Sequence, residues 1–155
     1  LETAIPAERD RQVEAKLTAS EIAEKLDAKR IRRFVESEAF ARICAADEVL
    51  RELDFITALP AAEVLAAQGT APASAAVAQA KVLVQGIADL VLVFPDHLEL
   101  LDYKTDRRKS EADFLAAYRA QLDLYALAIS KRFAPKPVTY KGIYSLELGK
   151  LIEVK

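Results

Sequence analysis

The 155-residue sequence is short of several residue types that often define a protein's class. It has no methionine, no tryptophan, one cysteine and one histidine. A lone Cys44 forms no disulfide within the chain, builds no zinc site by itself and holds no iron–sulfur cluster. Because Cys44 lies in a helical pattern, we expect it to be a small buried hydrophobe.

Long apolar runs and export signals are also missing. No window approaches the roughly 18 apolar residues of a membrane-spanning helix, and the N-terminus lacks the order of a signal peptide. We therefore expect a cytoplasmic protein with no membrane partner. Because the sequence starts at Leu1 and has no methionine, we also expect a piece of a larger chain.

Charge of one sign is scarce as well. The sequence has 24 acidic and 22 basic residues, which gives a net charge of −2 at pH 7. This balance excludes a general electrostatic attraction to nucleic acid, so a polyanion would need a local patch, a metal or a neighbouring domain. The hydrophobic share of 52% is enough to close the core of one domain.

Hydrophobic periodicity predicts an α/β domain with a mixed sheet. Residues 7–46 read as two or three helices, with a capping box at Thr18–Glu21. After a strand at Val49–Leu59, an alanine-rich stretch to Ala80 reads as a short helix and a loose connection. Two strands, at Lys81–Phe94 and Leu98–Thr105, are expected to form a hairpin. A helix at Ser110–Phe133 follows, beginning with the capping sequence Ser110–Asp113, and two closing strands lie within Val138–Lys155.

Three charged residues interrupt the apolar hairpin, namely Asp89, Asp102 and Lys104. Buried charges cost free energy unless they are paired or coordinated. Asp102 and Lys104 share one face of their strand. If the turn is symmetric about Pro95 and Asp96, Asp89 and Asp102 are cross-strand neighbours with Cβ atoms about 5 Å apart.

Two carboxylates this close repel each other unless a cation lies between them. Mg²⁺, with Mn²⁺ as an alternative, binds one or two carboxylates together with waters and phosphate oxygens. Lys104 would then position or deprotonate the attacking water and offset charge in the transition state. On the following helix, Gln121 and Tyr125 share a face with Tyr118, and a Gln amide and a Tyr hydroxyl there could orient a phosphate or the water. The pattern favours metal-assisted phosphodiester hydrolysis.

Each feature also has a structural interpretation. An Asp and a Lys two residues apart more often form a strand-end salt bridge than a metal site. Tyrosines at helical spacing are more often core residues, and Glu52 in "RELDF" is as readily a surface carboxylate. The matched positions of Asp89 and Asp102 within apolar strands favour the site.

In order and spacing, "QGIADLVLV", "LELLDYKTD" and "YRAQLDLYALAI" resemble the C-terminal nuclease domain of AddA, the helicase-nuclease subunit of bacterial AddAB. More broadly, they resemble the RecB-type nucleases of the PD-(D/E)XK superfamily. The resemblance covers Val49 to the C-terminus. It implies a restriction-endonuclease-like core with a mixed central sheet flanked by helices. We expect one nuclease domain over 1–155, with a helical part at 1–47 and a catalytic core at 48–155.

The resemblance also implies the site residues. Asp89, Asp102 and the Tyr103 carbonyl would be metal ligands, and Lys104 the catalytic lysine. The supporting helix motif would be Gln121 and Tyr125, while Glu52 falls in a strand that resembles the family's R-E-x-P-F, with Asp54 in place of Pro. The implied activity is Mg²⁺-dependent cleavage of single-stranded DNA during double-strand break repair. The implied partners are the helicase part of the same chain and a second, AddB-like subunit.

One departure from the family keeps alternatives open. These nucleases usually carry a metal-binding His on an N-terminal helix, and the lone His97 falls in the hairpin turn. Either that His precedes Leu1 or this member has lost it, so we expect the isolated chain to be weakly active or inactive. The alternatives are a catalytically inactive module that binds DNA or another protein of the complex, and a stand-alone phage-type exonuclease.

Overall fold

The computed structural model describes residues 28–107 and 110–155. The chain divides into two units between Arg33 and Phe34, and the fold below is that of the second unit. Helix α3 (Ala28–Val35) spans the division. The expected capping box at Thr18–Glu21 lies outside the described residues, and the single-domain boundaries stay a prediction.

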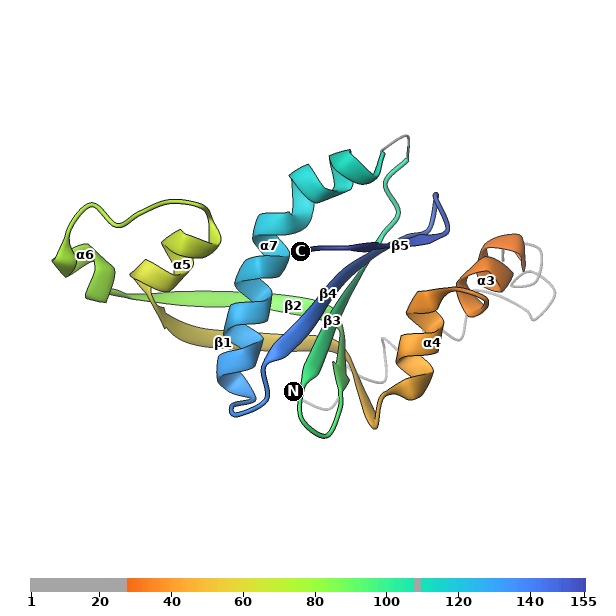
Figure 1. Ribbon diagram of the computed structural model, residues 1–155, viewed down its shortest axis with the longest axis horizontal. Helices are drawn as coiled ribbons and strands as arrows, with labels where there is room; N and C mark the ends of the chain where they lie inside the picture. The colour runs from red at the N-terminus through yellow and green to blue at the C-terminus, as the bar shows by residue number, and fades with distance from the viewer. Residues whose placement is uncertain (1–27, 108–109) are drawn as a thin grey trace, which may run out of the picture. The chain divides into compact units, whose positions relative to one another are not determined.

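A mixed five-stranded sheet forms the centre of this unit (Figure 1). Its spatial order is β1-β2-β3-β4-β5, the same as the chain order. All neighbouring strands are antiparallel except β3 and β4, which run parallel. The α/β class with a mixed sheet is therefore confirmed. The strands are Glu48–Pro60, Lys81–Val93, Leu98–Lys104, Val138–Ser145 and Lys150–Glu153.

The β2–β3 hairpin has the register expected from a symmetric turn. Val93 pairs with Leu98, and the Phe94 N–H donates to the His97 carbonyl at 3.0 Å. Each further pair steps one residue back on β2 and one forward on β3, as far as Leu90 with Leu101. The turn therefore fixes the register that the acidic residues follow.

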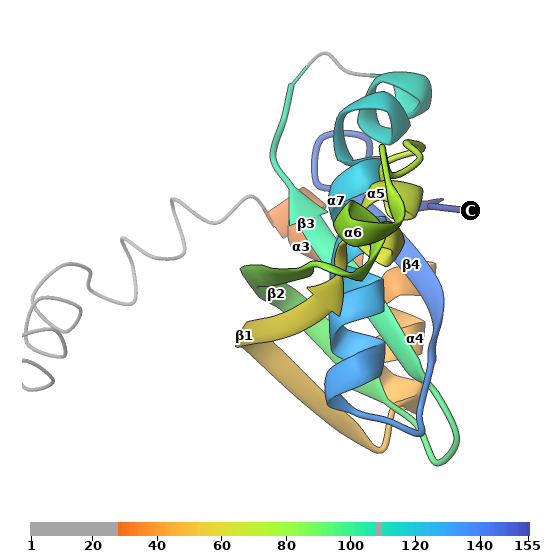
Figure 2. The same ribbon diagram turned by 90° about the vertical axis from the view of Figure 1, so that its left-hand side faces the viewer.

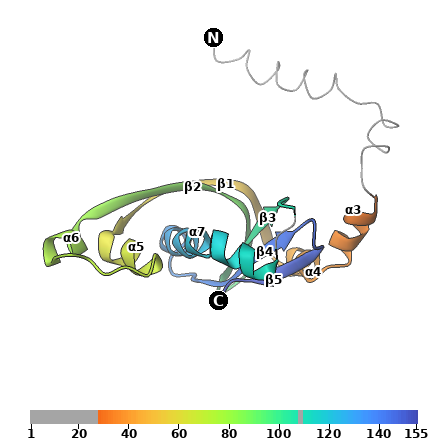
Figure 3. The ribbon, with the colours of Figure 1, turned by 90° about the horizontal axis from the view of Figure 1, so that it is seen from above.

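Helix α7 (Glu111–Arg132) makes the crossover that parallel β3 and β4 require. It starts at the capping box formed by Ser110 and Asp113, as the sequence predicted. In Figures 2 and 3 it lies against one face of the sheet, with β1 and β2 arching over it. Its buried side chains and the strands form the larger core cluster, which includes Val91, Leu98, Leu100, Phe114, Leu122 and Ile129.

Helix α4 (Glu38–Ala45) packs on the opposite face, where Leu90, Leu92 and Leu101 form a second cluster. Arg42 of α4 reaches Glu99 at 2.8 Å. The prediction that Cys44 is buried is wrong, because its side chain is exposed. Ile43 packs against the cluster, and the next residue of a helix points about 100° away from it.

Between β1 and β2 the chain forms α5 (Ala61–Ala67) and a second short helix, α6 (Ala75–Gln79). The sequence predicted one helix and a loose connection here. Ser74 explains the additional helix, because its hydroxyl accepts from the N–H of Val77 as an N-cap. Across the described ranges, no helix combines the length and the hydropathy needed to cross a membrane.

Candidate active site

The β1–β2 ladder is interrupted at one place, between Glu52 and Asp89. Arg51 pairs with Leu90 and Leu53 with Ala88, so the register is the same on both sides while the residues between them form no pair. Glu52 has a φ of 47°, in the left-handed region that a residue with a Cβ rarely occupies. This distortion breaks the extended backbone of β1.

The interruption changes which side chains face α7. Ala88 and Val91 pack in the same core cluster, although strict alternation would put residues three apart on opposite faces. On β1 the same is true of Leu50 and Leu53. Both strands therefore reverse their alternation at this point, and Asp89 lies where the reversal occurs.

Asp89 bonds to the next strand through its side chain. The β2–β3 ladder ends at Leu90 and Leu101, one step before Asp89 and Asp102 would pair. There the Oδ2 atom of Asp89 accepts a hydrogen bond of 2.8 Å from the backbone N–H of Tyr103. The expected cross-strand ladder pair does not form, but the Asp89 carboxylate is fixed next to the residue that follows Asp102.

Asp102 is a buried carboxylate with only 5% of its surface exposed. Burial raises its pKa, the hydrogen bond and the charge of Lys104 lower it, and the negative charge of Asp89 raises it again. The net effect is a raised pKa. Its Oδ2 atom lies against Nζ of Lys104 but has no hydrogen bond of ordinary geometry to any described residue.

Lys104 ends β3 on the same face as Asp102, as the alternation predicted. Its backbone is fixed by a 3.0 Å hydrogen bond from the Leu146 N–H to its carbonyl. Its ammonium ion-pairs with Asp102 and lies 4.7 Å from the ring centroid of Tyr118 on α7. The structure therefore brings Asp89, Asp102 and Lys104 together at the end of β3.

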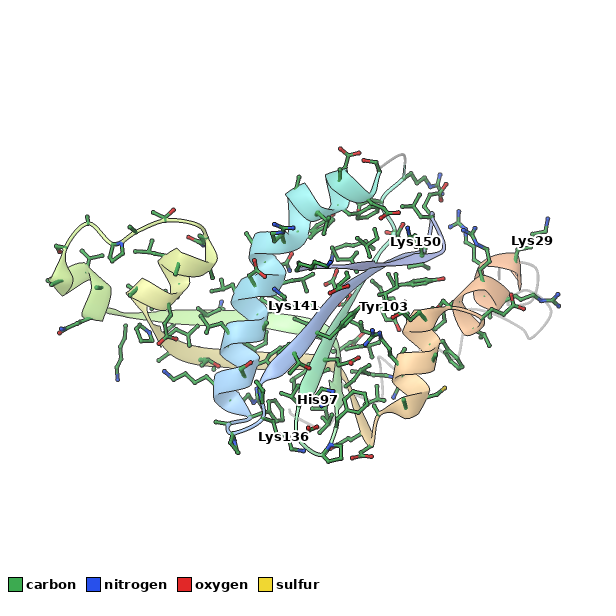
Figure 4. All side chains as sticks on the ribbon, viewed as in Figure 1. Lys29, His97, Tyr103, Lys136, Lys141 and Lys150 are labelled. Atoms are coloured by element: carbon green, nitrogen blue, oxygen red, sulfur yellow. The ribbon has the colours of Figure 1, made fainter. Side chains whose placement is uncertain are left out.

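The Tyr103 side chain points to the other face of the sheet. Its ring meets those of Phe34 and Tyr144 edge to face, at 5.7 Å and 6.3 Å between centroids. Burial raises the pKa of its phenol. Figure 4 shows Tyr103 well separated from His97, which lies at the β2–β3 turn. Tyr103 can therefore contribute only its backbone to the carboxylate site.

Tyr125 of α7 contacts β2 at Gly86, three residues before Asp89. Its ring meets that of Phe55 edge to face at 4.8 Å, and Phe55 pairs with Gly86 across the β1–β2 ladder. A Cβ at position 86 would lie 2.4 Å from the Tyr125 hydroxyl oxygen. Only glycine leaves room for this ring, so the contact links "GIAD" on β2 to "QLDLY" on α7.

The remaining predicted site residues make fewer contacts. Glu52 is opposite Asp89 across the two strands, with an exposed side chain. Gln121 is exposed on α7, and its side chain has no hydrogen-bond partner among the described residues. His97 is half-buried, stacks on Phe94 at 4.5 Å and contacts Asp96. It takes no part in the carboxylate site.

Two features of the site were not predicted from the sequence. The first is the left-handed backbone at Glu52, for which a residue with a Cβ gives no signal. The second is the pair of contacts that Tyr118 makes, with its ring facing the Lys104 ammonium and its hydroxyl donating to Oδ2 of Asp106 at 2.9 Å. The helical spacing predicted that Tyr118 shares a face with Gln121, but it did not identify these partners.

We predict that Gly86→Ala destabilises the fold by about 2 kcal/mol, because the methyl group overlaps the ring of Tyr125. Urea unfolding measures the loss. In a protein that already carries Tyr125→Leu, adding Gly86→Ala should lower the unfolding free energy much less than it does in the wild type. An equal cost in both backgrounds would show that the ring does not limit residue 86.

We predict that Asp102→Asn becomes more stable relative to the wild-type chain as the pH rises from 4 to 7. The raised pKa means that the fold prefers the protonated carboxyl, so this stabilisation is lost as the pH rises through the folded-state pKa. Each unit of raised pKa corresponds to about 1.4 kcal/mol in unfolding free energy. Asp123→Asn, at the ion pair with Lys141, is the control. A difference that shrinks with rising pH would contradict the account.

Comparison with known proteins identifies the family. Residues 2–151 match the model of the PD-(D/E)XK nuclease superfamily. Three proteins that are named as subunits of an ATP-dependent helicase/nuclease are similar to the chain. The one from Ligilactobacillus salivarius is 36% identical over 90% of this chain and 11% of its own length. Those from Geobacillus kaustophilus and Syntrophomonas wolfei are 34% and 30% identical, over 94% and 99% of this chain and 12% of their own lengths.

The chain thus spans only 11–12% of the length of these relatives. The family match nevertheless covers nearly all of it, including both acidic strands and α7. The mixed sheet flanked by helices agrees with that match. The chain belongs to the PD-(D/E)XK nuclease superfamily.

Proposed function

We propose that the chain is a metal-dependent DNA exonuclease domain that hydrolyses phosphodiester bonds of single-stranded DNA during double-strand break repair and recombination. One observation carries the proposal. Two carboxylates from neighbouring strands, Asp89 and Asp102, meet at the end of an apolar hairpin beside a lysine. Such an arrangement is unfavourable for stability, so it favours a chemical role.

The donor set fits a hard divalent cation. Nucleases of this superfamily typically use divalent metal ions. Here the buried Oδ2 of Asp102 has no hydrogen bond of ordinary geometry within the described part of the chain, and the charge of Asp89 acts on the same carboxyl. Asp89 and Asp102 would hold Mg²⁺ or Mn²⁺, and the Tyr103 carbonyl is the further ligand we propose. When bound, the cation would polarise a phosphate oxygen and acidify a water.

The residues of the chain provide the remaining chemistry. The Tyr103 N–H holds Oδ2 of Asp89, which leaves the other carboxylate oxygen of Asp89 for binding. Lys104 supplies a positive charge beside the carboxylates, where it would orient the attacking water and offset charge on the phosphate. Tyr125 fixes the strand that carries Asp89 through its contact with Gly86.

Glu52 and Gln121 complete the proposed site. Glu52 lies across the strand pair from Asp89, and its exposed carboxylate is available to a water or to the substrate. Gln121 offers a free amide on α7, one turn before Tyr125, for a DNA phosphate. Neither side chain forms a hydrogen bond with another described residue. Both are therefore available to a substrate.

The substrate and the partners are inferred from the relatives' names. Those names describe subunits of an ATP-dependent helicase/nuclease, and the chain spans a small share of their length. We infer that a helicase part of the same polypeptide delivers single strands to this site, and that a second, AddB-like subunit completes the enzyme. We also infer a cytoplasmic location, where such DNA is repaired.

We predict that Asp89→Ala, Asp102→Ala and Lys104→Ala each lower Mg²⁺-dependent cleavage of single-stranded DNA by at least about a hundredfold, measured in the complete protein. Asp123 of α7 and Lys141 of β4 form another Asp–Lys ion pair, which includes none of the proposed site residues. Asp123→Asn and Lys141→Ala are therefore matched controls and should cleave at near the wild-type rate. Cleavage by the Asp102 variant at the control rate would refute the proposal.

The rival function is a module that binds DNA or a partner without cleaving it. One observation favours it, because no group of three His, Cys, Asp or Glu side chains suited to a metal occurs among the described residues. Mn²⁺ titration separates the two functions. The nuclease predicts a rise in melting temperature on adding Mn²⁺ that Asp89→Ala abolishes, and the rival predicts no such rise.

We predict that only one of two variants of Glu52 is more stable than the wild type. Glu52→Gly removes both the carboxylate and the strain of a φ of 47°, and should stabilise the fold by about 1 kcal/mol, as measured by urea unfolding. Glu52→Ala removes the carboxylate but keeps the strain. Both should cleave DNA more slowly than the wild type. If Glu52→Gly cleaved DNA at the wild-type rate, the Glu52 carboxylate would have no role in cleavage.

A further inference from the structure

Tyr118 contacts the proposed site, and neither the family resemblance nor the proposed function gives it a role. It lies on α7 and is half-buried. Its ring meets the Lys104 ammonium, with 4.7 Å between Nζ and the ring centroid. Its hydroxyl donates to Oδ2 of Asp106 at 2.9 Å. One side chain thus contacts both the last residue of β3 and the segment that follows it.

The ring of Tyr118 is held in place from behind. Phe114, one turn earlier on α7, is fully buried, and its ring centroid lies 6.2 Å from that of Tyr118. The capping box at Ser110 and Asp113 fixes the start of the same helix. The ring therefore presents its face to Lys104 from a rigid support, as a positioning group requires.

Lys104 has two partners of different chemical kind. The first is the carboxylate of Asp102, and the second is the uncharged ring of Tyr118. When a carboxylate binds a divalent cation, its negative charge is neutralised, and its attraction for a nearby ammonium becomes weaker. An aromatic face attracts the ammonium through its quadrupole and does not compete for the cation. Only 19% of the Lys104 side chain is exposed, which strengthens that attraction.

We propose that Tyr118 is a positioning residue, which holds the Lys104 ammonium over its ring when Asp102 acts as a metal ligand. The inference rests on the proposed function, in which Lys104 acts at the phosphate. The ring face carries this role. The hydroxyl bond to Asp106 anchors the strand-to-helix segment and is secondary.

The test measures kcat in the complete protein for variants that keep or remove the aromatic ring at position 118. Tyr118→Phe keeps the ring and should retain kcat within about threefold. Tyr118→Leu removes it and should lower kcat for single-stranded DNA about tenfold, because a displaced catalytic group loses rate. The KM for DNA should stay within about twofold, since Lys104 acts in the transition state rather than in substrate binding.

Fluorinated phenylalanines at position 118 give a series that does not depend on tolerance of leucine. Each added fluorine weakens the attraction of the ring face for a cation while nearly preserving its shape. We expect kcat to fall stepwise with fluorination at an unchanged melting temperature. Tyr140, whose ring lies 3.6 Å from the Arg42 guanidinium on the other face, is the matched control, and the same series there should leave kcat unchanged.

Two results would overturn the inference. The first is a kcat that does not respond to fluorination at position 118, and the second is a Tyr118→Phe variant as slow as Tyr118→Leu, which would assign the effect to the hydroxyl. Failure of the proposed function is distinguishable, because then either the wild-type protein would not cleave DNA or Lys104→Ala would cleave it at the wild-type rate. Loss of cleavage in Lys104→Ala with no fluorine effect refutes the role of Tyr118 alone.

Discussion

A single hydrogen bond, from the Tyr103 N–H to the carboxylate of Asp89, joins the two strands that carry the acidic residues of the site. The donor belongs to the backbone of β3, and the acceptor is a side chain of β2 where the ladder has ended. A backbone N–H beyond the end of a ladder needs a partner. Asp89 supplies it, and the same bond keeps this carboxylate beside Asp102, where like charges would otherwise separate them.

That bond depends on the distortion in β1 and β2. The left-handed backbone at Glu52 breaks the ladder opposite Asp89, and beyond it both strands reverse the faces that their side chains present. The contact of Tyr125 with Gly86 fixes β2 three residues earlier. Helix α7 thus acts on the carboxylates at two points, through Gly86 upstream of Asp89 and through Lys104 downstream of Asp102. A rigid helix and a strained strand hold charges that the sheet alone would disfavour.

The sequence predicts much of this arrangement. Alternating apolar residues and the turn at Pro95 and Asp96 predict the hairpin register, which the observed pairs confirm. Capping residues predict the start of α7. The distortion at Glu52 was not predicted, because no residue near Glu52 in the sequence indicates it. No local preference of glutamate favours a φ of 47°, so the sequence around Glu52 gives no signal for it.

The remaining errors have similar causes. Cys44 was expected in the core because of its residue type, but its position on α4, one residue after the inward-facing Ile43, exposes it. The need for glycine at position 86 also depends on a residue distant in sequence, Tyr125. Periodicity places residues on faces, but it does not identify which side chain of another element meets them. Long-range contacts of this kind require the folded structure.

Anomalous diffraction from a crystal grown with Mn²⁺ tests the central claim most directly. The account predicts a peak between the carboxylates of Asp89 and Asp102, with metal–oxygen distances of roughly 2.0 to 2.3 Å, and Lys104 directed toward Tyr118. Density for Mn²⁺ elsewhere, or none between these two carboxylates at a concentration that supports cleavage, would contradict it.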